Sequence, residues 1–169
     1  MNDMTIPPEP HGAVLISETG VERYQLVGRT GPSVFLMGGA INHGGMKSGP
    51  GPFDLLASAL GACTAMTIRA YAERKALPIT RVQVNVVHGR PSLDAKDVFE
   101  RTILVEGVID DATRAKLLQI ADLCPVGKTL ARGSEIRTLL SPDFQNADAS
   151  PPVADYMQTM EQVWAELPL

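Results

Sequence analysis

The two cysteines are the residues of this chain best suited to carry chemistry. Cys63 lies in the middle of the apolar segment Pro52–Lys75, and Cys124 stands directly before Pro125. A pair of thiols can react with an oxidant in two steps, in which one thiolate attacks and becomes a sulfenic acid and the other resolves it to a disulfide. Free cysteine is also among the most buried residue types, so two inert core thiols are the alternative interpretation.

Cys124 has a second feature that favours reactivity. If it is the N-cap of a short helix beginning at Pro125, its sulfur lies at the positive end of a helix dipole, where free N–H groups favour thiolate over thiol. Lys128, one turn further on, would add to that field. The apolar stripe of the preceding helix, expected from Asp110 to about Leu123, continues through Cys124. We therefore expect both sulfurs to face the interior, where they could meet.

Cys63 would be carried by a long buried helix over Pro52–Lys75. Proline suits the first helical position, and alanine, leucine and methionine are good helix formers. The uncharged run Leu55–Ile68 is about 14 residues, short of the ~20 that cross a bilayer. A helix that is apolar on every side and too short to span is a core helix, so we expect no membrane contact.

The rest of the pattern predicts antiparallel sheet around this helix. Short β-prone runs at Ala13–Ser17, Glu22–Val27 and Ser33–Met37, separated by turn residues, predict a meander. The alternating runs Arg81–His88 and Val98–Val108 predict a second antiparallel pair. With a last strand at 134–140, the chain is predicted to be α+β, with antiparallel sheets wrapping a long central buried helix.

We expect one domain over residues 1–141, in which residues 1–11 form a loose N-terminal arm. Residues 142–169 would be a polar linker followed by an amphipathic helix. A central helix this apolar is hard to cover in a monomer of 169 residues. A dimer in which two such helices pack together would bury it.

Composition excludes several classes of function. The net charge is −4 and no run of lysine and arginine forms a basic patch, so no nucleic-acid partner is expected. The N-terminal sequence MNDMTIPPEP has no cationic start and no apolar run, so we expect no signal peptide. Two cysteines in such a chain indicate the reducing cytoplasm.

Two motifs resemble a known family. Residues 52–64 read PFDLLASALGACT, and the second cysteine lies in LCPV at residues 123–126. Together, in this order and at this separation, they resemble the OsmC/Ohr family of organic hydroperoxide reductases, most closely its OsmC-like branch. The glycine-rich lead-in at Gly44–Pro50 fits as well, and the resemblance spans residues 12–140.

This resemblance implies an obligate, intertwined homodimer with Cys63 as the peroxidatic thiol and Cys124 as the resolving thiol. It implies an organic or lipid hydroperoxide as the oxidant, reduced to the alcohol in oxidative-stress defence. The reductant would be a dithiol, such as a lipoylated protein, or a small thiol. No cofactor, metal or flavin is implied, because the thiolate itself attacks the O–O bond.

The sequence departs from the family at one position. Well-studied members carry a glutamate ten residues before the first cysteine, which holds an arginine beside the thiolate. Here that position is Phe53, and Asp54 follows it. On an ideal helix Asp54 faces away from Cys63, since nine residues separate them.

The activating arginine of the family comes from the N-terminal β-hairpin. Arg29, expected in a turn, is the first candidate in this chain and Arg23 the second. Arg69, on the same helix as Cys63 and about 120° round it, is a further possibility.

Three interpretations follow. The chain is a hydroperoxide reductase acting through Cys63 and Cys124, or a non-peroxidatic OsmC-like dimer that binds an apolar small molecule or senses oxidants in the same cleft. In the third, both thiols are inert core. A zinc site made from the cysteines with His43 and His88 would lack the short paired ligand spacing of such sites.

Overall fold

The computed structural model describes residues 14–39 and 44–143. Contacts divide the described residues into two compact units, one made of residues 14–39, 44–52 and 137–143 and the other of residues 53–136. The expected N-terminal arm and terminal amphipathic helix lie outside the described residues.

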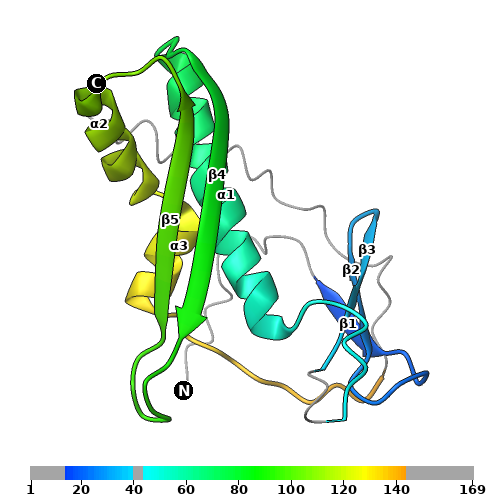
Figure 1. The fold of residues 1–169 in the computed structure, drawn as a ribbon. Coiled ribbons are helices and arrows are strands. Elements are labelled where there is room, and N and C mark those ends of the chain that lie inside the picture. Colours follow the sequence, from blue (N-terminus) through cyan, green and yellow to red (C-terminus); the bar gives the residue numbers. More distant parts are fainter. Residues whose placement is uncertain (1–13, 40–43, 144–169) are drawn as a thin grey trace, which may run out of the picture. The chain divides into compact units, whose positions relative to one another are not determined.

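The described part of the first unit is built on a three-stranded meander, drawn in blue in Figure 1. Its strands are β1 (Leu15–Glu18), β2 (Leu26–Thr30) and β3 (Ser33–Met37), paired antiparallel in the order β1-β2-β3. This confirms the predicted meander. The second strand begins later than expected, because the chain before it turns, with Tyr24 at a φ of 63°. Arg29 therefore lies within β2 and not in the following turn.

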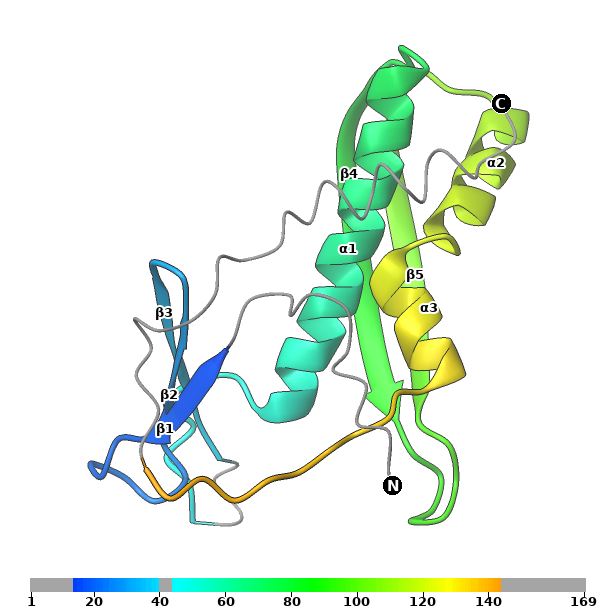
Figure 2. The same cartoon turned by 180° about the vertical axis from the view of Figure 1, so that it is seen from behind.

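The second unit contains the long helix and the second strand pair. Its elements are α1 (Pro52–Arg74), β4 (Ile79–Gly89), β5 (Val98–Gly107), α2 (Asp111–Ala121) and α3 (Pro125–Arg132). β4 and β5 form a long antiparallel hairpin, and α1 and α3 lie side by side on one of its faces (Figures 1 and 2). The central helix and the hairpin that covers it are as predicted.

The hairpin presents alternate side chains to the helices. Val82 lies opposite Val105, Val84 opposite Ile103, and Val86 opposite Arg101. These positions are partly buried, whereas their neighbours along each strand are exposed. An arginine thus occupies one of the inward positions of an otherwise apolar face.

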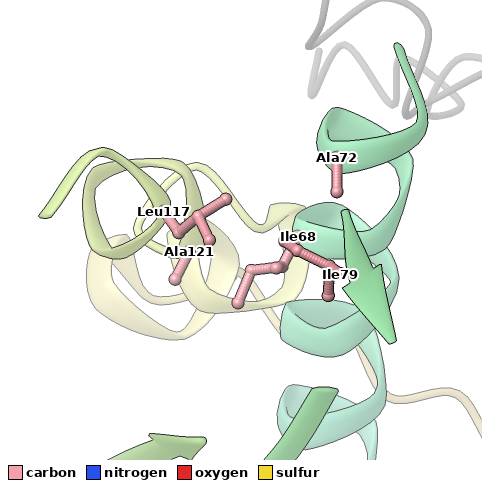
Figure 3. Close-up of a cluster of buried hydrophobic side chains, with 5 residues drawn as sticks. All are labelled: Ile68, Ala72, Ile79, Leu117 and Ala121. Carbon is pink, nitrogen blue, oxygen red and sulfur yellow. The ribbon is translucent and has the colours of Figure 1, made fainter. Parts of the chain in front are cut away.

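A core of aliphatic residues joins α1 to α2 and to the start of β4. In Figure 3 the side chains of Leu117 and Ala121 on α2 point toward Ile68 on α1, and Ile79 and Ala72 complete the cluster. Ile68 is fully buried, and a side chain of this size contributes about 2 kcal/mol when it leaves water. By length and mean hydropathy (1.3) α1 also meets the criterion for a membrane span, but this packing makes it a core helix.

The start of α2 is capped as its sequence predicts. Asp110 is the N-cap, and its side chain accepts a hydrogen bond of 2.8 Å from the backbone N–H of Thr113. Hydrogen bonding with the side chain of Thr113, and next with its backbone N–H, lowers the pKa of Asp110.

The expected strand at 134–140 is wrong. Residues 133–141 have no regular secondary structure, and the side chains of Ile136, Leu139 and Leu140 are almost fully exposed. A strand needs a hydrogen-bonding neighbour, and none of the described strands pairs with this segment. The side-chain pattern of a segment does not reveal whether a neighbouring strand is available to pair with it.

Candidate functional site: a buried dithiol

The two cysteines meet in the interior of the second unit. Cys63 on α1 and Cys124 before α3 are 61 positions apart in the chain, and their Sγ atoms are 2.6 Å apart. Neither cysteine forms a disulfide and both are buried, with exposed fractions of 3% and 0%. This is within reach of a disulfide after a small movement, since the bond itself is about 2.05 Å long. Two unrelated core thiols would have been favoured by a distance between the two Sγ atoms well beyond disulfide reach, and the structure does not show such a distance.

Cys124 is the N-cap of α3, as its sequence context predicts. Its Sγ accepts a hydrogen bond from the backbone N–H of Gly127 at 3.5 Å, and its carbonyl accepts from the N–H of Lys128. Pro125 occupies the first turn, where its missing N–H costs nothing. The helix ends at Gly133, whose φ of 78° suits glycine. The short helix thereby holds the second sulfur at its positive end.

The side chain of Cys124 is hydrogen-bonded to that of Cys63. Its thiol donates to the Sγ of Cys63, and this hydrogen bond, followed by burial, raises the pKa of Cys124 well above that of a free thiol. The N–H of Gly127 opposes this shift by stabilising the thiolate, with a smaller effect. Cys63 is therefore the hydrogen-bond acceptor of the dithiol, which is the role of an attacking sulfur.

Two threonines line the same face of α1 without leaving an unpaired hydroxyl. Thr64 donates to the carbonyl of Leu60 and Thr67 to that of Cys63, both at 2.8 Å, and both side chains are fully buried. Thr64 also lies within hydrogen-bonding reach of Cys124 and favours its thiolate. Polar atoms beside the sulfurs are thus held in fixed positions by the helix itself.

Arg101 is a charged residue beside the dithiol that the sequence analysis missed. Its Nη1 donates to Thr64 Oγ1 at 3.1 Å and to the carbonyl of Ala121 at 2.9 Å, and its Nη2 donates to Asp122 Oδ1 at 2.7 Å. The signal was present in the sequence, because 101 falls on the inward phase of an alternating strand. A cation at such a position needs hydrogen-bonding partners in the interior, so its presence indicates a buried polar site.

A pocket of about 740 Å³ opens beside the dithiol. It is lined by the apolar side chains of Phe53, Leu56, Leu60, Phe99, Leu130 and Ala131, by charged Lys96, Asp97, Arg101, Asp122, Lys128 and Arg132, and by Gly127 and Gly133. Neither sulfur is part of the wall. Leu60, Arg101 and Gly127 belong both to the wall and to the surroundings of the cysteines. The pocket therefore ends against the residues that surround the two thiols.

Phe53, which stands where the family resemblance predicts a glutamate, belongs to this wall. Its ring stacks on His88 with centroids 4.4 Å apart, and His88 stacks on Phe99 at 4.6 Å. The Nε2 of His88 lies 2.7 Å from Asp97 Oδ1, and Arg90 donates to both oxygens of that carboxylate. These partners, His88 first, lower the pKa of Asp97. The position thus serves aromatic packing rather than an ion pair.

The remaining predicted site residues lie apart from the sulfurs or in the other unit. Arg69 donates to the carbonyls of Ile79 and Thr80 and so ties α1 to the start of β4. Asp54 is exposed in the first turn of α1, where its charge suits the helix dipole. Arg29 is exposed on β2, in the first unit. The site residues that the structure brings together are Cys63 and Cys124.

The site is a dithiol formed between a central helix and the N-cap of a second helix, beside an antiparallel hairpin. This arrangement places the chain among mixed α/β proteins with a buried pair of thiols. The model of the OsmC-like protein family matches residues 44–138, which is more than half of the chain. The chain belongs to the OsmC-like family.

Solved structures share this fold at low sequence identity. A putative osmotic stress induced and detoxification response protein from Psychrobacter arcticus is 17% identical, with a TM-score of 0.62 over 75% of this chain and 91% of that one. An organic hydroperoxide resistance protein OsmC from Legionella pneumophila is 14% identical, with a TM-score of 0.55 over 70% and 88%. The organic hydroperoxide resistance protein OhrB of Bacillus subtilis is 18% identical, with a TM-score of 0.51 over 70% and 88%. No curated protein matches the sequence.

Proposed function

We propose that the chain is a thiol-dependent peroxidase that reduces organic hydroperoxides to alcohols in oxidative-stress defence. The observation that carries this proposal is the 2.6 Å approach of Cys63 Sγ to Cys124 Sγ, both of them buried. Two buried thiols in contact can exchange between dithiol and disulfide without rearranging the fold. That is what a two-electron reduction of a peroxide requires from the protein.

The reaction balances with these two residues and an external dithiol. The Cys63 thiolate attacks the terminal peroxide oxygen, the O–O bond breaks, and the alkoxide leaves as the alcohol after taking a proton. Cys63 is then a sulfenic acid. Cys124 loses its proton, attacks Cys63 Sγ and expels water, which leaves a disulfide. A dithiol, such as a lipoyl group on a protein, restores both thiols by exchange.

The pocket suits an apolar organic peroxide. Its wall places the rings of Phe53 and Phe99 and the side chain of Leu60 in one cavity that ends at the surroundings of the dithiol. The Legionella and Bacillus proteins of the same fold are described as organic hydroperoxide resistance proteins. We therefore assign the alkyl or aryl part of the peroxide to this cavity.

Arg29 is the cation that we assign to the activation of Cys63. The family resemblance supports this assignment, and β2 holds Arg29 opposite Leu15 and Val34 at an exposed position. Replacing Arg29 with glutamine should lower the rate of the first oxidation step, whereas the same change at Arg81, exposed on the hairpin, should not. The cycle would operate in the cytoplasm, where dithiol reductants are available.

We also propose that the chain acts as a homodimer. α1 is apolar on the face away from its core contacts, where exposed or partly exposed residues recur at helical spacing: Leu55, Ala59, Ala62, Met66 and Ala70. Met66 is 54% exposed. The same stripe on a second copy would cover it, because self-complementary patches are the usual basis of two-fold dimers.

The direct test is a steady-state assay with cumene hydroperoxide and dihydrolipoamide as reductant. The wild-type protein should turn over, and Cys63→Ser should lose at least about 100-fold of the rate because it has no nucleophile. Full activity in Cys63→Ser would overturn the mechanism. A matched control is Ser58→Ala on the same helix, at an exposed position outside the site.

A second candidate function is favoured by Phe53. With an aromatic ring at the position of the family glutamate, the cavity could serve a module that binds an apolar small molecule without turnover. This alternative predicts saturable binding of an apolar probe by the reduced protein with no consumption of peroxide. Turnover in the assay above decides against it.

A further inference from the structure

Arg101 occupies a position that sheet geometry reserves for apolar side chains. It lies on the inward face of β5 opposite Val86, and its side chain is only 20% exposed. Taking a guanidinium out of water is costly unless its donors are paired. Here Thr64, Ala121 and Asp122 supply three acceptors, so the fold has built a specific environment for this cation.

These three acceptors belong to the two segments that carry the cysteines. Thr64 follows Cys63 directly on α1. The carbonyl of Ala121 accepts from Arg101 and also from the backbone N–H of Cys124, at 3.2 Å. Asp122 is the C-cap of α2, two residues before Cys124. One side chain therefore joins the backbone that holds the second sulfur to the helix that holds the first.

The guanidinium is also close to Cys124 itself. Its Nη1 and the Cβ of Cys124 each lie 3.9 Å from the point where a Cβ on Gly127 would be. The two atoms are therefore no more than about 8 Å apart, a range over which a fixed charge acts in a partly buried site.

We propose that Arg101 is the positioning residue for disulfide formation: it holds Cys124 against Cys63 through Ala121, Asp122 and Thr64. This inference rests on the proposed function. The step it serves is the attack of Cys124 Sγ on the sulfenic acid of Cys63, in which an S–S bond forms, the S–O bond breaks, the thiol proton leaves Cys124 and water is released. Attack on sulfur depends on the alignment of the two reacting atoms. Arg101 controls this alignment because its guanidinium bonds to both segments that carry the cysteines.

The test separates the two chemical steps in Arg101→Gln. Trapping with dimedone measures formation of the Cys63 sulfenic acid by cumene hydroperoxide, and loss of free thiol at Cys124 measures disulfide formation. We expect the second rate to fall about tenfold more than the first, because only the second needs the alignment of Cys124. Arg101→Lys keeps the charge but cannot reach all three acceptors, so it should lie between. Arg81→Gln, an exposed arginine on the same hairpin, should match the wild type.

A second measurement needs no peroxide. Equilibration of the protein with oxidised and reduced glutathione gives the effective concentration of the Cys63–Cys124 pair, and we expect Arg101→Gln to lower it about tenfold. Asp122→Asn keeps Arg101 but weakens its hydrogen bond to residue 122, so it should lower the effective concentration by less. This variant replaces Arg101→Gln in the test if Arg101→Gln does not fold. If the wild type does not reduce the peroxide but Arg101→Gln still lowers the effective concentration, the peroxidase proposal is refuted and the positioning role of Arg101 is kept. An unchanged effective concentration, or an equal slowing of both chemical steps, would overturn the role.

Discussion

The two cysteines of this chain receive different roles from their immediate surroundings. Cys124 is held at a helix N-terminus, yet its thiol donates to Cys63, and that bond with burial outweighs the stabilising N–H of Gly127. The sulfur with the raised pKa is suited to resolve, and its hydrogen-bond acceptor is suited to attack. Helix position alone would have predicted a lowered pKa for Cys124.

The first prediction concerns the titration of Cys124. Removing its acceptor with Cys63→Ala eliminates the largest cause of the raised pKa, so the pKa of Cys124 should fall. A lower pKa means more thiolate at a given pH, and alkylation at pH 8 should therefore be faster than for Cys124 in the wild type. Thiolate absorbance at 240 nm across a pH series checks the shift.

The matched control keeps the acceptor and changes a neighbour. Thr67→Val removes a hydroxyl that bonds the carbonyl of Cys63 and leaves the sulfurs in place. It should leave the titration of Cys124 close to that of the wild type. A titration of Cys124 that does not move in Cys63→Ala would show that the thiol–thiol bond does not set its pKa.

The second prediction concerns the aromatic wall of the pocket. Phe53→Ala removes a ring that stacks on His88 and lines the cavity. Such aromatic contacts are worth about 0.5–1.5 kcal/mol, so kcat/KM for cumene hydroperoxide should fall about 2- to 10-fold. For tert-butyl hydroperoxide, which has no ring, the fall should be smaller. An equal loss for both peroxides would mean that Phe53 does not contact the substrate.

At the residue scale the sequence predicts the cysteines and not their environment. The motifs around Cys63 and Cys124 and the capping role of Cys124 follow from local residue types. The partners of Arg101 come from three separate elements, and only the folded chain brings them together. The inward phase of position 101 was visible, but its acceptors were not.

At the scale of elements, the hairpin depends on a glycine at its open end, where β4 begins and β5 ends. The ladder shifts register between Ile79 and Arg81, where two residues of β4 span one step of β5. Gly107 lies at this bulge with a φ of 152°, and a Cβ there would be 2.2 Å from the carbonyl oxygen of Pro78. Backbone approaches this closely only where a side chain is absent.

The third prediction follows from this contact. Gly107→Ala should destabilise the protein by about 2 kcal/mol or more, because both the φ and the clash involve backbone atoms that cannot move aside. Urea denaturation followed by circular dichroism measures the change. Gly89→Ala at the other end of β4, where a Cβ would meet nothing within 4 Å, is the control and should change stability by less than about 0.5 kcal/mol. Equal effects at the two positions would contradict the assigned role of Gly107.

Elements with a strong periodic pattern were predictable, and those that depend on a neighbour were not. The alternation of β4 and β5 and the apolar run of α1 identified these elements nearly to the residue. The segment 134–140 carries β-prone residues, but the described strands offer it no partner. β2 was placed too early because the turn at Tyr24 was not visible in its sequence.

At the scale of the whole molecule, α1 has one covered and one uncovered side. Ile68 and Ala72 pack into the core with Leu117, whereas Ala62 and Met66 are exposed. A stripe of apolar residues along a central helix is the kind of surface that a second subunit covers.

The fourth prediction tests the dimer at this stripe. Met66→Glu places a charge in the centre of the stripe and should convert the dimer to monomer at micromolar concentration, because a buried unpaired carboxylate is costly. Size-exclusion chromatography with light scattering measures the mass. Leu118→Glu, equally exposed but on α2, should remain dimeric. A wild-type protein that is monomeric, or a Met66→Glu protein that stays dimeric, would contradict the stripe as the interface.

The central claim is that Cys63 and Cys124 act together on an organic peroxide. The most direct measurement is mass spectrometry of the native protein after one equivalent of cumene hydroperoxide, with alkylation and peptide mapping. The two-cysteine cycle predicts a loss of two hydrogen atoms and a disulfide between Cys63 and Cys124 of one chain. An unchanged mass, or oxygen added at Cys63 while Cys124 remains alkylatable, would contradict it.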